Sequence, residues 1–150
     1  MQWCQKDIQQ YNEAEQYVDT LVIPLMPMAV NQQMDKLGFQ GELLKLYVNG
    51  LEQHYKGRLF LMPTYAYFHP ENDEQEINRL NTWIAEMKQK PFEHVFLFSF
   101  DSFWKKHERK LDGTLLWVPA MQTGNLDDSN TKVMMNDQLK EIIGLIKSFW

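Results

Sequence analysis

The clearest pattern of hydrophobic positions lies at residues 93–104, which read E-H-V-F-L-F-S-F-D-S-F-W. Residues 95–98 within this stretch are apolar without interruption. A run of this length is too short for an ordinary helix and lacks the alternation of a half-exposed strand. It predicts a strand buried on both faces, which is the central position of a parallel sheet covered by helices.

Three other short apolar runs predict strands at residues 18–25, 59–63 and 115–118. Apolar residues elsewhere recur at spacings of three and four, which predicts amphipathic helices. These helices cover residues 42–55, 73–88 and 131–149, with a more polar helix at 3–17 and a short one within 102–111. In the sheet we expect five buried residues, namely Ile23, Leu61, Val95, Leu97 and Leu116.

Strands that alternate with helices predict parallel pairing through right-handed crossovers. We therefore expect an α/β fold, a three-layer sandwich with a mainly parallel four-stranded sheet and helices on both faces. Numbered along the chain, the strands should lie in the order 2-1-3-4. Residues 1–150 should form a single domain, as is usual for a chain of this length.

Two apolar connections follow the first two strands. Residues 24–30, P-L-M-P-M-A-V, carry two prolines. Because proline removes a backbone donor and disfavours helix before it, we expect an extended loop. This loop either packs beneath its own helices or lines a binding site, since methionine is an adaptable contact residue. Residues 64–70, T-Y-A-Y-F-H-P, are expected to form another loop.

With this strand order, the connections that leave the first and third strands diverge, and a crevice opens between their carboxyl ends. The side chains delivered there are mostly apolar or aromatic, which suits recognition better than proton transfer or metal binding. We therefore expect Met26→Asp to abolish binding and Asp101→Asn to have a modest effect. The candidate ligand- or partner-binding residues are Met26, Pro27, Met28, Tyr65, Tyr67, His69, Ser99, Asp101, Met121 and Gln122.

Asp101 is the most suggestive titratable residue because it comes just after the central strand. Its position resembles that of the phosphoacceptor of receiver domains, but the acidic pair and the lysine that accompany it there are lacking. One interpretation is that Asp101 caps the short helix that follows. The alternative is an enzyme of unknown class that uses Asp101 with His69 or Tyr65, which requires a mutual geometry that sequence does not show.

Motifs for established chemistries are missing from the sequence. It has no G-x-x-x-x-G-K-[ST] loop, no G-x-G-x-x-G fingerprint and no G-x-S-x-G elbow. Cys4 is the only cysteine, and the four histidines lack partners at metal-motif spacing, so we expect no metal and no cofactor. Gly38 and Gly41 are expected at the entry of the helix at 42–55, where amides meet anions, although a helix-entry turn explains them equally well.

Composition limits the partners. The chain is 44% hydrophobic and 23% charged, as folded proteins are, and its net charge of -5 disfavours broad binding to nucleic acid or anionic membranes. No signal sequence and no apolar stretch of about 20 residues is present, so we expect a cytoplasmic protein away from the membrane. The basic segment 105–110, beside Trp104, is a candidate for RNA binding, but such a cluster is more typical of a solvated helix face.

Trp3, the stretch Y-V-D-T-L-V-I-P ending at Pro24 and the stretch K-G-R-L-F-L-M-P ending at Pro63 resemble the YpiF-like family of short bacterial proteins. The resemblance covers the whole chain and implies a soluble bacterial protein. It implies no activity, so no catalytic or binding residue carries over from it. The sequence as a whole favours a non-catalytic binding or regulatory module that recognises a protein partner or a small ligand at the carboxyl edge of its sheet.

Overall fold

Five parallel strands form the sheet in the computed structural model, which describes residues 1–121 and 125–150. The order is β2-β1-β4-β5, with β3 paired to β1 beyond the end of β2. The expected α/β fold is confirmed, and the four expected strands lie in the expected order. The strands are β1 (Thr20–Met28), β2 (Leu59–Leu61), β3 (Tyr65–Phe68), β4 (His94–Ser99) and β5 (Thr114–Trp117).

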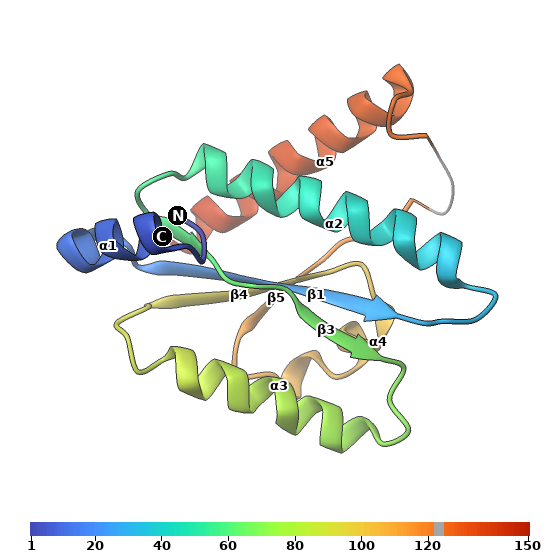
Figure 1. Cartoon of the computed structure of the whole chain (residues 1–150), viewed down its shortest axis with the longest axis horizontal. Helices are drawn as coiled ribbons and strands as arrows, with labels where there is room; N and C mark the ends of the chain where they lie inside the picture. The colour runs from blue at the N-terminus through green and yellow to red at the C-terminus, as the bar shows by residue number, and fades with distance from the viewer. Residues whose placement is uncertain (122–124) are drawn as a thin grey trace.

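Helices cover both faces of the sheet, as Figure 1 shows. One face packs against α2 and α5, and the other against α3, α4 and α1, so the described residues form three layers with an apolar core on each side of the sheet. The helices are α1 (Gln5–Ala14), α2 (Met34–His54), α3 (Asp73–Met87), α4 (Ser102–Lys106) and α5 (Ser129–Ser148), with short 3-10 helices at Glu15–Tyr17 and Glu108–Lys110.

The central strand β1 continues to Met28, so the loop expected at residues 24–30 is mostly strand. The expectation was wrong because Pro24 and Pro27 lack a backbone N–H only at positions where no paired residue of a neighbouring strand would accept a hydrogen bond from it. The carbonyl of Val22 accepts from Met62 N, so even-numbered residues of β1 direct their backbone groups to the β2 side. Pro24 therefore faces the break between β2 and β3. Pro27 faces the β4 side, beyond the last β1–β4 pair.

The loop expected at residues 64–70 instead contains β3, so the sheet has five strands rather than four. β2 and β3 are two parts of one edge strand, interrupted at residues 62–64. Val22 pairs with Leu61, but Leu25 pairs with Tyr65, so the interruption inserts one extra residue. A shift of one residue moves a strand's side chains to the opposite face. As a result, Tyr65 and Tyr67 are buried on the α3 side.

Helix α2 begins at Met34, well before the expected start at residue 42. Gly38 and Gly41 therefore lie inside the helix, and their amides belong to its hydrogen-bonded ladder rather than to an anion site at its entry. The anion-binding interpretation of these glycines is wrong. A Cβ on Gly41 would stand 3.2 Å from Met26 Cε, so this glycine allows α2 to approach β1 closely.

The expected core is confirmed. All five sheet residues named from the sequence are buried, and Ile23 and Leu97 are fully enclosed. None of the helices in the described part of the chain combines the length and apolar content that a membrane span requires.

Candidate functional site

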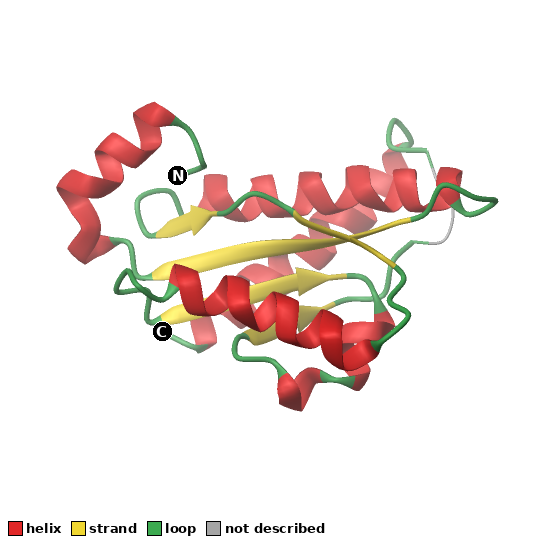
Figure 2. Ribbon diagram, turned by 60° about the horizontal axis from the view of Figure 1, so that its bottom comes forward, coloured by secondary structure: helices red, strands yellow, loops and turns green. Residues whose placement is uncertain are grey.

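A pocket of about 540 Å³ opens at the carboxyl ends of β1 and β4. Its walls come from the loop after β1, the first turns of α2, the end of β3, the start of α4 and the segment after β5. Because the strands are parallel, these segments meet at one edge of the sheet (Figure 2). Five of the residues expected at this edge line the pocket, namely Pro27, Met28, Tyr67, His69 and Asp101.

Asp101 and Tyr67 are held in a hydrogen-bonded network at the pocket. Tyr67 Oη donates to Asp101 Oδ2 at 2.6 Å, and Trp104 Nε1 donates to Tyr67 Oη at 2.8 Å. Asp101 Oδ1 accepts from the backbone N–H of Phe103 at 3.0 Å, which confirms that Asp101 caps α4. Both carboxylate oxygens of Asp101 therefore have structural partners.

The electrostatics of the network keep Tyr67 protonated. Burial, followed by the nearby carboxylate of Asp101, raises the pKa of Tyr67 far above its usual value of 10.0. The hydroxyl is thus a fixed donor to Asp101. His69 is exposed and lines the same pocket, but within residues 1–121 and 125–150 no hydrogen bond joins it to Asp101. Asp101 and His69 thus line one pocket without a hydrogen bond between them in the described part of the chain.

The structure places other expected site residues outside the pocket lining. Tyr65 faces α3, where its hydroxyl donates to Glu76 Oε1 at 2.8 Å. Met26 packs on the α2 side of the sheet. Ser99 is fully buried, and its Oγ accepts from the backbone N–H of Asp101 at 2.9 Å.

Two expected site residues come from the segment after β5. Met121 packs against the core between the sheet and the α2 and α5 helices. Gln122 lies outside the described residues.

Polar residues of α2 complete the pocket, and they are not among the residues predicted from the sequence. Lys36 and Gln40 line it because the first turns of α2 stand beside the end of β1. The spacing of Leu37, Gly41 and Leu44, at intervals of four and three, was the available signal that the helix begins earlier. Trp117, at the end of β5, also lines the pocket.

A second group of polar side chains lies at the opposite edge of the sheet. The ligand atoms of Asp19, Glu93 and His94 lie within 4.8 Å of one another. However, the guanidinium of Arg58 donates to both oxygens of Asp19, at 3.0 and 3.1 Å. Burial raises the pKa of Asp19, but hydrogen bonds from Arg58 and Thr20 outweigh it, so the pKa lies below its ordinary value. We therefore interpret Asp19 as the carboxylate of an ion pair with Arg58.

The basic segment 105–110 lacks the aromatic platform that the RNA hypothesis needs. Trp104 is fully buried, so its ring is closed to a base. Lys105 pairs with Glu108 at 3.2 Å, and Lys110 pairs with Glu74. The segment therefore resembles a solvated surface with ordinary ion pairs.

The described residues define a small parallel α/β protein with a ligand-sized pocket at the carboxyl edge of its sheet. The chain belongs to the family described as "Protein of unknown function (DUF2487)", whose model matches residues 9–150. It is also 28% identical, over 100% of its length and 98% of the relative's, to "Uncharacterized protein YpiF" of Bacillus subtilis (strain 168). The resemblance to a bacterial YpiF-like family is thereby confirmed. No solved structure matches the chain.

Proposed function

We propose that this protein is a single-domain, cytoplasmic, non-catalytic binding module that holds a small polar ligand in the carboxyl-edge pocket. The observation that carries the proposal is the pocket itself. Its volume of about 540 Å³ is in the range of small-molecule sites, and it lies where the connections from β1 and β4 diverge. A concave site of this size favours a small ligand over a protein partner as the occupant.

The pocket's walls indicate the chemistry of the ligand. Lys36 and Gln40 offer hydrogen-bond donors, and Asp101 provides a carboxylate, while Phe100 and Trp117 offer apolar surface. A ligand with an apolar ring or stem and several polar groups matches this mixture. The side chains that would orient it come from α2 and α4, which are anchored in the two cores.

Binding is favoured over catalysis because the carboxylate of Asp101 already accepts hydrogen bonds that stabilise the fold. Its two oxygens accept from Tyr67 and from the N-terminus of α4, and these bonds compete with proton transfer to a substrate. A general base must also lie within hydrogen-bond distance of the substrate proton that it removes. The second candidate remains an enzyme that uses Asp101 with His69, since both residues line the pocket.

The test is a thermal-shift screen of small polar metabolites, followed by calorimetric titration of each compound that stabilises the protein. Ala29 lines the pocket, and Val30, beside it, does not and is 79% exposed. We expect Ala29→Trp to fill the pocket and remove binding, and Val30→Trp to bind normally. Likewise, Lys36→Glu should weaken an anionic hit, while Lys45→Glu, on an exposed position further along α2, should not.

Equal binding by Ala29→Trp and wild type would overturn the proposed site. Turnover of a hit that disappears in Asp101→Asn, with binding retained, would replace the binding module with the enzyme. Binding confined to a macromolecular partner would likewise contradict the small-ligand proposal.

A further inference from the structure

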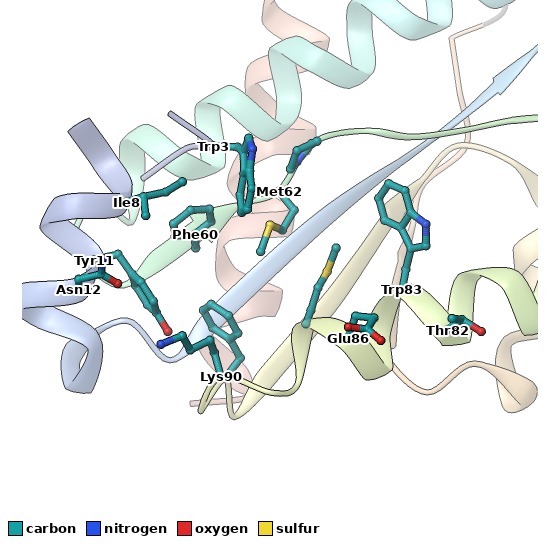
Figure 3. Close-up of a pocket in the computed structure, with 13 residues that line it drawn as sticks. Trp3, Ile8, Tyr11, Asn12, Phe60, Met62, Thr82, Trp83, Glu86 and Lys90 are labelled. Carbon is teal, nitrogen blue, oxygen red and sulfur yellow. The ribbon is translucent and has the colours of Figure 1, made fainter. Parts of the chain in front are cut away.

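A second cavity, of about 550 Å³, lies between α1 and α3 toward the amino-terminal edge of the sheet. Figure 3 shows Trp3, Ile8 and Tyr11 on one side of it and Trp83 on the other, with Phe60 and Met62 between them. Of the described residues, none lines both this cavity and the carboxyl-edge pocket. Its properties are therefore independent of the proposed function.

The cavity is lined mainly by aromatic and aliphatic side chains. The ring of Tyr11 packs against Phe60 at 5.6 Å and against Phe92 at 5.7 Å between centroids, so the three rings form one packed wall. Trp3 is 62% exposed at the opening, which is unusual for the largest apolar side chain. A preformed apolar cavity with exposed aromatic residues at its rim is the usual form of a small-molecule site.

One polar atom just behind this apolar wall has no hydrogen-bond partner among the described residues. Tyr11 is only 5% exposed, and its hydroxyl is buried without a hydrogen-bond partner among the described residues. Buried polar side-chain atoms in folded proteins are almost always hydrogen-bonded, so this hydroxyl is a donor that a bound acceptor could satisfy. Burial, followed by the carboxylate of Glu15, raises the pKa of Tyr11, which keeps the hydroxyl protonated as a donor.

The charges at this end of the cavity select the kind of acceptor. Lys90 Nζ lies 6.0 Å from the centre of the Tyr11 ring, and Figure 3 shows both polar tips at the same end of the cavity. However, Lys90 already pairs with Glu15 at 3.2 Å, so its charge is balanced. Glu86 adds a further carboxylate on the Trp83 side of the cavity. A balanced ammonium and a second carboxylate in the lining disfavour an anionic head group. A neutral acceptor fits this arrangement better.

We propose that this cavity binds a neutral, largely apolar small molecule of the ketone or ester class, whose carbonyl oxygen accepts a hydrogen bond from Tyr11. The apolar body of the ligand lies against Phe60, Met62 and Trp83. Its carbonyl reaches Tyr11 after the exposed side chain of Lys90 swings aside.

Three probes of matched size test the proposal: butyrophenone, butylbenzene and 4-butylbenzoate, which carry a neutral acceptor, no acceptor and an anion. Binding is measured by NMR from the indole N–H signals of Trp3 and Trp83, which line the cavity. We expect butyrophenone to bind, and Tyr11→Phe to weaken it about fivefold, the worth of one hydrogen bond. The same variant should leave the Kd of butylbenzene unchanged.

Tyr11→Phe removes a hydroxyl without a protein partner in the described residues, so its melting temperature should be equal to or above that of wild type. A second variant tests the place of binding without Tyr11. Asn12→Trp should block the cavity, whereas Gln10→Trp, on an exposed position of α1 outside the lining, should bind as wild type does. The proposal is overturned if butyrophenone does not bind, if Tyr11→Phe leaves its Kd unchanged, or if 4-butylbenzoate binds more tightly.

Discussion

The indole nitrogen of Trp150 donates a hydrogen bond of 2.9 Å to Thr20 Oγ1, so the chain just after α5 is tied to the first residue of β1. The guanidinium of Arg58 lies 3.6 Å above the same indole ring, and Tyr55 contacts it edge-on at 4.5 Å. Trp150 is therefore docked against the sheet. These contacts connect α5, the end of α2 and the start of the central strand.

Trp150→Ala should lower the free energy of unfolding by about 2–3 kcal/mol, since the side chain is half-buried and full burial is worth more. The melting temperature should fall by several degrees in a domain of this size. Trp150→Phe keeps the stacking and loses the hydrogen bond to Thr20, so we expect about 1 kcal/mol from it. Leu145→Ala, at an exposed position of α5, is the control. An unchanged melting curve in Trp150→Ala would show that the docked indole contributes nothing to stability.

The ion pair between Asp19 and Arg58 predicts a pH dependence of stability. The pKa of Asp19 in the folded protein lies below its usual value of 3.8. A depressed carboxylate pKa stabilises the fold at pH values above the unfolded-state pKa, and this contribution disappears as the pH falls through the folded-state pKa. Asp19→Asn should therefore lower the melting temperature at pH 7 and differ less from wild type below about pH 4.

Melting curves of wild type and Asp19→Asn between pH 3 and pH 7 measure this effect. Asp112→Asn, at an exposed position, provides a control for the loss of one negative charge. A difference between Asp19→Asn and wild type that grows toward low pH would contradict the assigned sign.

Leu97→Ala tests the central position of β4. Leu97 is fully buried between β1 and β5, which pair with it on either side. Truncation leaves a cavity, so we expect a loss of about 2–5 kcal/mol in urea-induced unfolding with little change in the m-value. A loss below 1 kcal/mol would mean that the neighbouring strands collapse into the space.

Patterns that arise within one element were readable from the sequence. The uninterrupted run at residues 95–98 identified the central strand, and the alternation of strands and helices gave the order of the four main strands. β3 was missed because its existence depends on an extra residue at positions 62–64. That insertion is defined by pairing with β1, which is a property of two distant segments rather than of either alone.

The candidate site was predictable in place but only partly in composition. The crevice at the carboxyl edge follows from strand order, and Pro27, Tyr67 and Asp101 do line it. The contributions of Lys36 and Gln40 were missed because the start of α2 was placed too late. The direction of the side chains was also not predicted. Side chains alternate between the two faces along β1, and that of Met26 lies on the α2 side rather than in the pocket.

The position of Met26 changes what its substitution should report. Met26→Asp places a carboxylate between β1 and α2, against Gly41 and beside the apolar core on that side of the sheet. We expect the variant to lose several degrees of thermal stability, so a loss of binding in it would reflect damage to the fold. Met26→Leu, which conserves apolar volume, should melt close to wild type. If Met26→Asp melts like wild type and fails to bind, Met26 itself contacts the ligand.

Asp101→Asn separates the structural and chemical roles of this residue. An asparagine can still cap α4, but its amide nitrogen cannot accept the hydrogen bond of Tyr67. Tyr67 is 2% exposed, so its hydroxyl is left without an acceptor, and we expect a loss of about 1–3 kcal/mol in unfolding free energy. Tyr67→Phe should remove most of this penalty when combined with Asp101→Asn, which a double-mutant cycle measures.

Ligand affinity provides the second measurement on the same variants. Under the binding-module proposal, Asp101→Asn should change the Kd of a carboxyl-edge ligand by less than about tenfold, since one hydrogen bond is worth roughly 1 kcal/mol. A catalytic Asp101 predicts a different outcome, because removal of a general base typically lowers turnover by about 10²–10⁴-fold while the substrate still binds. Additive stability losses in the cycle would show that Tyr67 and Asp101 are not coupled. Asp101 would then lack the structural role that argues here against catalysis.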